Sequence, residues 1–303
     1  MEDKLVDFPQ ELLNLINQQY SKDIVNSIID AYNSKRETTF RVNLIKSNCS
    51  LVESELSSTN IKFVKNNIIE NAYKINADDY ANLINLNCYK DGHIYIQSFS
   101  SMLPPLMVDY KNNIDVLDMC SAPGGKTTMI ASLTNNGCNI MACEKDKVRT
   151  EKLKFNVLKQ GAKKVNVENI DALKLDDFYK FDIVFLDAPC SGSGTLNKYT
   201  NNGKYFSKKL VENSSQLQTK LLNKAINLTK VGGTIVYSTC SILKQENEDI
   251  INSALKTQRV ELEKIDNKYQ QLPLLESKIS DCLVVCPTKE YEGFFVAKLK
   301  KIK

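Results

Sequence analysis

Two cysteines stand directly after predicted strands, among small residues that leave room for a substrate. Cys190 lies in residues 186–192, LDAPCSG, and Cys240 lies in residues 237–241, YSTCS. Consecutive strands beyond the switch point of a doubly wound parallel sheet lie side by side, so we expect both thiols in one crevice at the carboxyl ends of the strands. Chance placement is the alternative interpretation, because cysteine is often buried.

A glycine turn precedes both cysteines in the chain. Residues 120–126, CSAPGGK, join a short apolar run, predicted to be a buried strand, to a predicted helix, and such a junction presents free backbone N–H groups to a ligand. The spacing disfavours a P-loop, which would require glycine at Cys120, and the dinucleotide pattern G-x-G-x-x-G is absent. Glu144 follows the next strand about 20 positions later, where a ribose contact is expected. These features favour an adenosine-type ligand.

A thiol pair beside an adenosine site suits the methylation of cytosine at carbon 5. This carbon becomes nucleophilic only after a thiolate adds to carbon 6, and a second group can assist the later elimination. An acid must also protonate ring nitrogen 3. Asp187 is the available candidate, because the only histidine, His93, is distant in the sequence. A cysteine thiol has a pKa of about 8.5, so the nucleophile needs a local positive field, for which Lys126 is a possible source.

Three motifs together closely resemble those of the RNA 5-methylcytosine methyltransferases of the Nop/Sun type. They are DMCSAPGGKTT at residues 118–128, LDAPCSGSG at 186–194 and YSTCS at 237–241. Weaker similarities extend the resemblance over most of the chain: Arg41, Val42 and Asn43; Tyr95, Ile96 and Gln97 with Ser101; and EGFFVAK at residues 292–298. The three main motifs, in this order and at strand ends, are highly specific.

The resemblance implies a methyl donor, a partner and a set of roles. The donor is S-adenosylmethionine and the partner is RNA. Cys240 is implied as the nucleophile and Cys190 as the residue that helps to release the product, with Asp187 and Lys126 completing the catalytic set. The implied donor-binding residues are Cys120, Ser121, Ala122, Pro123, Gly124, Gly125 and Lys126 in the turn, Glu144 at the ribose, Asp171 near the adenine, and Asp187.

The elements that must position these residues alternate regularly along the chain. Strands followed by helices predict an α/β fold with a doubly wound, mostly parallel sheet that is seven-stranded and Rossmann-like, as in methyltransferases. The last two strands have no helix between them and are expected to form an antiparallel edge. We predict three parts: amino-terminal helices at residues 1–35, a small α/β module at 36–92 and the methyltransferase domain at 93–303. The resemblance identifies the small module as RNA-recognition-like.

Composition limits the remaining possibilities. The 303 residues are 25% charged and 42% hydrophobic, and a net charge of +4 permits an RNA partner without requiring one. Because no signal peptide or apolar run of roughly 18 residues is present, we expect no membrane association and a cytoplasmic location, or a nuclear or nucleolar one in a eukaryote. Nine cysteines without a C-x-x-C pair, together with a single histidine, disfavour disulfides and a metal site. We expect a monomer.

Residues 196–209 depart from the family pattern, in which an arginine-rich turn with a proline is usual. Their lysines and aromatic residues could contact phosphates and stack on bases, although a solvated loop is equally compatible: Lys198, Lys204, Lys208, Lys209, Tyr199, Tyr205 and Phe206. Asp118 could hold the glycine turn or contact the donor. Two other functions stay open, a DNA cytosine methyltransferase that uses the P-C thiol and a non-catalytic RNA-binding or ribosome-assembly protein. Both ribosomal and transfer RNA are compatible substrates.

Overall fold

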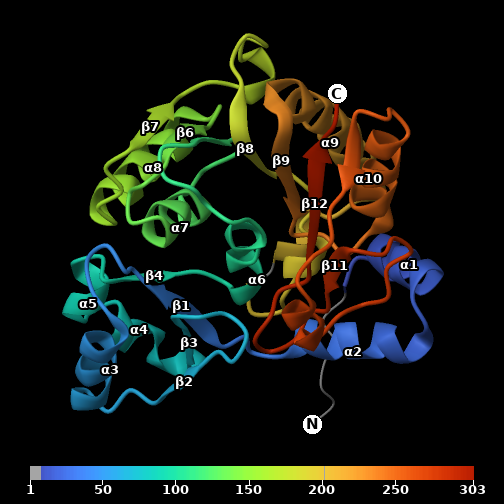
Figure 1. Cartoon of the computed structure of the whole chain (residues 1–303). Coiled ribbons are helices and arrows are strands. Elements are labelled where there is room, and N and C mark those ends of the chain that lie inside the picture. Colours follow the sequence, from blue (N-terminus) through green and yellow to red (C-terminus); the bar gives the residue numbers. More distant parts are fainter. Residues whose placement is uncertain (1–7, 201) are drawn as a thin grey trace.

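The computed structural model describes residues 8–200 and 202–303, and the predicted first segment therefore includes residues 1–7 outside this range. Within the described chain, eight strands form the main sheet, in the order β10-β12-β9-β8-β5-β6-β7, with β11 also paired to β12 (Figure 1). Strands β5 to β9 are parallel, and β12 pairs antiparallel with β9. The predicted fold class, a mostly parallel α/β sheet with an antiparallel edge, is confirmed.

The strands of the main sheet have the following bounds: β5 (Asp115–Asp118), β6 (Asn139–Cys143), β7 (Val165–Glu168), β8 (Phe181–Asp187), β9 (Thr229–Thr239), β10 (Val260–Leu262), β11 (Cys282–Val285) and β12 (Phe294–Lys301). The sheet is seven strands wide because β10 and β11 pair with opposite ends of β12. The described residues thus contribute eight strands to this sheet, one more than the seven predicted.

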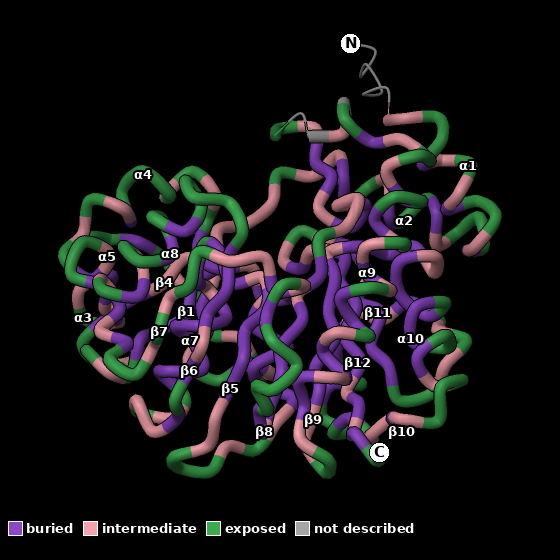
Figure 2. Tube along the Cα trace, turned by 90° about the horizontal axis from the view of Figure 1, so that it is seen from above, coloured by how far each residue is buried: buried purple, intermediate pink, exposed green. Residues whose placement is uncertain are grey.

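Helices cover both faces of this sheet. Side chains of β8 alternate between the two faces, as the pleat requires: Val184 and Leu186 join one buried cluster, and Ile183 and Phe185 join the other. Figure 2 shows the buried strands in the interior and exposed positions on the outer helices. The helices of this part are α6 (Phe99–Met102), α7 (Gly125–Leu133), α8 (Lys147–Lys159), α9 (Lys208–Leu228) and α10 (Glu248–Leu255). Short 3-10 turns are η2 (Pro104–Met107), η3 (Ala172–Lys174), η4 (Ser193–Thr195), η5 (Asn202–Tyr205), η6 (Lys244–Glu246) and η7 (Asn267–Gln271).

The two amino-terminal helices pack on the main sheet and hold loops at its edge. Helices α1 (Gln10–Gln19) and α2 (Lys22–Asn33) contribute apolar side chains to the same buried cluster as α9 and α10. The hydroxyl of Tyr20 donates to the carbonyl of Ile242 at 2.6 Å, and that of Tyr32 donates to the carbonyl of Ser193 at 2.5 Å. Both carbonyls lie in the loops that follow β9 and β8.

A second, smaller sheet has the order β2-β3-β1-β4 and its own buried cluster. Its elements are β1 (Thr38–Val42), α3 (Cys49–Ser58), β2 (Phe63–Lys65), β3 (Ala72–Ile75), η1 (Ala77–Asp79), α4 (Tyr80–Leu83), α5 (Asn87–Lys90) and β4 (Ile94–Ile96). Strand β4 lies beyond residue 92, so this sheet reaches into the segment assigned to the methyltransferase domain. The division into three parts stays a prediction.

Buried Arg41 of β1 joins the small sheet to the glycine turn. Its Nη2 donates to Thr128 Oγ1 at 2.8 Å and to the carbonyl of Gly125 at 3.2 Å, and its guanidinium lies 5.1 Å from the centre of the Tyr95 ring. Burial lowers the pKa of Arg41 to about 10.

No helix in the described part of the chain is both long and apolar enough to cross a bilayer.

Tyr32 provides a test of the contact between the amino-terminal helices and the sheet. Replacing Tyr32 with Phe removes the donor to the buried carbonyl of Ser193, and an unsatisfied buried carbonyl should lower the free energy of unfolding by about 1–3 kcal/mol. Urea denaturation measures the change. Tyr205→Phe is the control, because Tyr205 is 84% exposed and its loss should have little effect. Equal unfolding free energies for Tyr32→Phe and the control would contradict this contact.

Candidate functional site

The structure brings the two predicted thiols together. Cys190 Sγ and Cys240 Sγ are 3.0 Å apart, and each side chain is half-buried. Strands β8 and β9 are parallel neighbours whose register places Asp187 opposite Ser238, and Ser238 Oγ donates to Asp187 Oδ1 at 2.7 Å. The loops that follow therefore start side by side at the edge where ligands bind in such sheets.

The surroundings of Cys190 favour its neutral form. The pKa of Cys190 is raised well above its ordinary value, first by its hydrogen bond with Cys240, then by burial and by the negative charges of Cys240 and Glu246. Cys190 therefore keeps its proton and can donate it in a hydrogen bond to the Cys240 sulfur.

Lys126 forms an ion pair with Asp187. Its Nζ donates to Asp187 Oδ2 at 2.8 Å and to Ser101 Oγ at 2.8 Å, and it lies 5.4 Å from the centre of the Phe294 ring. The Lys126 side chain is only 9% exposed, so this ion pair is largely shielded from water. Lys126, the predicted cation, therefore contacts Asp187 at the end of β8, directly before the loop that carries Cys190.

The glycine turn is held by Asp118 and packed against α8. Ser121 Oγ donates to the carbonyl of Asp118 at 2.8 Å, and Thr127 Oγ1 donates to Asp118 Oδ2 at 2.6 Å. Gly124 has a φ of 109° and faces Leu153, where a side chain on the glycine would meet the leucine at 3.0 Å. Within the described residues, buried Asp118 Oδ1 has no partner in hydrogen-bond geometry. Asp118 therefore holds the turn and keeps one oxygen available for a ligand.

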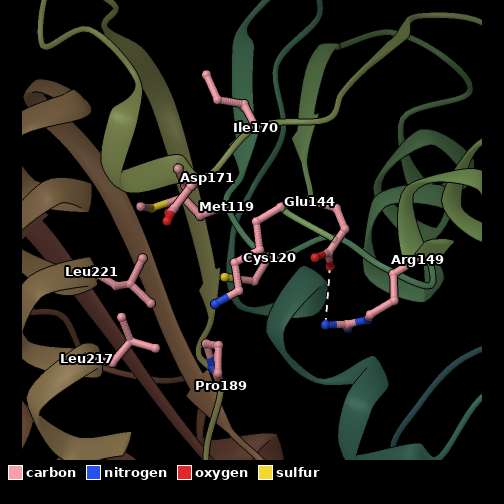
Figure 3. A pocket seen from close by; sticks show the side chains of 11 residues that line it. Met119, Cys120, Glu144, Arg149, Ile170, Asp171, Pro189, Leu217 and Leu221 are labelled. Atoms are coloured by element: carbon pink, nitrogen blue, oxygen red, sulfur yellow. Dashed lines mark ion pairs between the residues drawn. The ribbon is translucent and has the colours of Figure 1, made fainter. Parts of the chain in front are cut away.

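One cavity adjoins the turn at Cys120 (Figure 3). Glu144, directly after β6, and Asp171, after β7, both line this cavity. Each carboxylate already has a partner within the protein. Glu144 Oε2 pairs with Arg149 Nη1 at 3.3 Å, and Asp171 Oδ1 accepts a hydrogen bond from the amide of Leu173 at 3.0 Å. The remaining lining residues are mostly apolar: Met119, Cys120, Lys145, Ile170, Ala172, Pro189, Leu217 and Leu221.

A second cavity of about 300 Å³ lies on the other side of Cys120, between the small sheet and the main sheet. Its lining includes most of the predicted turn residues, and Gly124 is the exception, since it faces α8. Sequence reasoning did not assign Tyr95, Ser101 or Glu292 to the site. The lining residues are Tyr95, Ile96, Gln97, Ser98, Ser101, Asp118, Cys120, Ser121, Ala122, Pro123, Gly125, Lys126, Asp187 and Glu292.

Leu217 and Leu221 of α9 line the first cavity, and Figure 3 shows both side chains directed into it. Their i, i+4 spacing was the available signal, but it does not distinguish a core face from a ligand face. Arg149 was also missed, because nothing in the sequence indicates its pairing with Glu144.

The segment 196–209 matches its predicted role only in part. Tyr199 and Tyr205 are 60% and 84% exposed, and Lys198 Nζ lies 5.3 Å from the centre of the Tyr199 ring. Phe206 is buried in the core, so the expectation that it could stack on a base is wrong. Residue 201 and the side chain of Lys204 lie outside the described part. Among the described residues, no group of three or more histidine, cysteine, aspartate or glutamate side chains could hold a metal.

Asp118 should make the stability of the ligand-free protein depend on pH. Burial raises the pKa of its carboxyl from 3.8 to about 6. Between these values the folded chain binds a proton that the unfolded chain has lost, so the free energy of unfolding falls by about 3 kcal/mol as the pH rises. Asp118→Asn should remove this fall in urea denaturation at pH values across that range. Asp115→Asn, on the same strand but half exposed, should not. Identical pH dependence in wild type and Asp118→Asn would contradict the assignment.

Comparisons with known proteins agree with this geometry. A family model described as 16S rRNA methyltransferase RsmB/F matches residues 105–300. The ribosomal RNA small subunit methyltransferase F of Shewanella piezotolerans is 32% identical over 98% of this chain and 65% of the relative. Its Vibrio cholerae counterpart is 33% identical over 77% of this chain and 51% of the relative. The chain thus spans between about half and two thirds of the length of these relatives.

Solved structures share the fold over nearly the whole chain. A methyltransferase homolog protein from Pyrococcus horikoshii superposes with a TM-score of 0.80 at 29% identity, covering 97% of this chain and 99% of the other. NSun6 from Pyrococcus horikoshii, solved with SFG, has a TM-score of 0.85 at 22% identity, covering 98% and 99%, and shows the common fold. The chain therefore belongs to the RsmB/F methyltransferase family, which confirms its resemblance to RNA methyltransferases of the Nop/Sun type.

Proposed function

We propose that the chain is an S-adenosylmethionine-dependent RNA cytosine-5 methyltransferase that works through a covalent cysteine adduct. The observation that carries the proposal is the 3.0 Å separation of Cys190 Sγ and Cys240 Sγ next to a cavity suited to adenosine. Family membership supports methyl transfer to RNA. Because the chain spans only part of its relatives, their activity is carried over to it as part of the proposal.

The residues present fit S-adenosylmethionine, which supplies a methyl group on a positively charged sulfur. Leu217 and Leu221 provide apolar contact for the adenine, and Asp171 can accept from its amino group. Glu144 is a carboxylate acceptor suited to the ribose hydroxyls. The buried Asp118 Oδ1, which lacks a partner among the described residues, suits the cationic end of the donor.

Cys240 is the nucleophile in this proposal. Its thiol gives up a proton to water or to a base in the site, and the resulting thiolate bonds to carbon 6 of the cytosine. The electron pair displaced from the ring double bond makes carbon 5 nucleophilic. Lys126 Nζ, which donates to Asp187 Oδ2 at 2.8 Å, passes a proton to Asp187, and Asp187 donates that proton to ring nitrogen 3 as the carbon–sulfur bond forms. Methylation then occurs at carbon 5.

Cys190 assists the release of the product. Nitrogen 3 returns its proton to Asp187, and the proton of carbon 5 leaves to water or a base in the site. The electron pair of the carbon 5–hydrogen bond restores the ring double bond, and the bond between carbon 6 and the Cys240 sulfur breaks. Because the pKa of Cys190 is raised by its hydrogen bond with Cys240 and by burial, Cys190 remains a thiol. Its S–H can therefore donate to the departing sulfur and stabilise it as a leaving group.

The RNA must present its cytosine outside the base stack, because the neighbouring bases of a duplex cover both faces of the ring and block the approach to carbon 6. Tyr199, Tyr205 and Lys198 offer exposed aromatic faces and a cation that suit single-stranded RNA. The names of the relatives favour ribosomal RNA of the small subunit over transfer RNA.

The two cysteines should differ when each is replaced in turn. Cys240→Ser should abolish methyl transfer, whereas Cys190→Ser should form the adduct and release it slowly, so that RNA stays covalently bound. Denaturing gel electrophoresis of each variant after incubation with RNA and donor measures the bound fraction, and Cys138→Ser is a matched control at a buried cysteine away from the pair.

The opposite pattern would exchange the roles. If Cys240→Ser captured RNA that contains 5-fluorocytosine while Cys190→Ser did not, the P-C thiol would be the nucleophile, as expected of a DNA cytosine enzyme.

Glu144 should determine the affinity for the donor. Glu144→Gln removes a charged acceptor from the ribose site, and loss of a hydrogen bond to a charged group should weaken binding about tenfold or more. Isothermal titration calorimetry with S-adenosylmethionine measures the Kd, and Glu168→Gln on the exposed face of β7 is the control. Failure of the unsubstituted chain to bind the donor would instead support a non-catalytic RNA-binding protein.

A further inference from the structure

Glu246 is a buried carboxylate that holds the loop carrying Cys190. It ends η6, is fully buried, and belongs to the segment that follows Cys240. Its Oε1 accepts from the amide of Ser191 at 2.7 Å, and its Oε2 accepts from Ser191 Oγ at 2.6 Å. Gln218 Nε2 of α9 donates to Oε1 at 3.3 Å and also to the carbonyl of Pro189 at 2.9 Å. The carboxylate therefore contacts the residue next to Cys190 through both of its oxygens.

No cation balances this carboxylate among the side chains that the structure describes, where Glu246 forms no ion pair with lysine or arginine. Burial raises the pKa of Glu246, whereas hydrogen bonds from the neutral groups of Ser191, Ser241 and Gln218 favour its charged form. An uncompensated charge is costly inside a protein, and a neutral amide could make similar contacts with the loop. The charge itself therefore calls for a functional explanation.

We propose that Glu246 is the positioning residue that determines which thiol is the nucleophile, because its carboxylate is fixed through both oxygens on Ser191, directly beside Cys190, where a negative charge favours the neutral thiol. This inference rests on the proposed function, in which the two cysteines have different roles. It adds a residue of η6 to a site otherwise built from β8, β9 and the glycine turn.

The groups around Cys190 agree with this assignment. Cys240 and Tyr237 belong to β9 and the loop after it, Glu246 faces Cys190 from η6, and Asp187 precedes the Cys190 loop at the end of β8. The pKa of Cys190 is raised by the hydrogen bond with Cys240, then by burial, and then by the charges of Cys240 and Glu246. Lys126, the nearby cation, is engaged by Asp187. Once Cys240 is bonded to a pyrimidine and carries no charge, Glu246 remains as the anion beside Cys190.

Alkylation of a single thiol tests the inference. In a Cys240→Ser background, the rate at which iodoacetamide modifies Cys190 is followed against pH by mass spectrometry of its peptide. Glu246→Gln should move the midpoint of this profile down by about one pH unit, since a neighbouring negative charge is removed. Glu248→Gln is the matched control: Glu248 is also a buried glutamate, two positions further on, but it bonds to Ser277 and should leave the midpoint unchanged.

Ser191→Ala distinguishes the effect of the Glu246 charge from the effect of its hydrogen bond to the Ser191 hydroxyl. It removes the hydroxyl donor but keeps the carboxylate, so the Cys190 midpoint should not fall. An unchanged midpoint in folded Glu246→Gln, or an equal fall in Ser191→Ala and Glu246→Gln, would overturn the inference. Circular dichroism establishes that each variant is folded.

If Glu246→Gln does not fold, the two single-substitution chains Cys240→Ser and Cys190→Ser decide. The midpoint for Cys190 in Cys240→Ser must then lie above the midpoint for Cys240 in Cys190→Ser, and the reverse order overturns the inference. These measurements need neither RNA nor methyl donor. Their failure would therefore leave the methyl-transfer assay of Cys240→Ser as an independent test of the proposed function.

Discussion

The site depends on the parallel pairing of β8 with β9. Their register places Asp187 opposite Ser238, so the two following loops begin at the same height and bring Cys190 and Cys240 to 3.0 Å. A shift of register by two residues would displace one thiol by about 7 Å and separate the pair. Segments distant in the sequence hold these loops in place, as the hydrogen bond from Tyr32 to the loop after β8 shows. The amino-terminal helices therefore help to define the geometry of the thiols as well as the core.

Much of this arrangement could be predicted from the sequence, because it follows from rules on sheets. Alternating strands and helices indicate a parallel sheet, and the side chains that follow such strands converge at one edge. This rule places Cys190 beside Cys240, and it places Glu144 and Asp171 around one cavity. The motifs then give chemical meaning to positions that the fold brings together.

The rest could not be predicted because it comes from contacts between distant elements. Glu246 lies in a short turn with no periodic pattern, and its bonds to Ser191 span 55 positions. Arg149 reaches Glu144 from the next helix, and no spacing rule identifies that pair. Phe206 shows the opposite limit: its aromatic type and basic surroundings suggested a surface for stacking, but the fold uses it as a core residue. Local residue type indicates what a side chain can do, whereas burial decides what it does.

In the proposed mechanism, Cys240 carries the pyrimidine while Cys190 remains a free thiol beside it. The most direct measurement is peptide mass spectrometry of the complex that the unsubstituted chain forms with RNA containing 5-fluorocytosine and the methyl donor, after nuclease and protease digestion. We expect a methylated fluorocytidine nucleotide on the peptide that contains Cys240 and an unmodified peptide that contains Cys190. A nucleotide attached to the Cys190 peptide would contradict the assignment of Cys240 as the nucleophile.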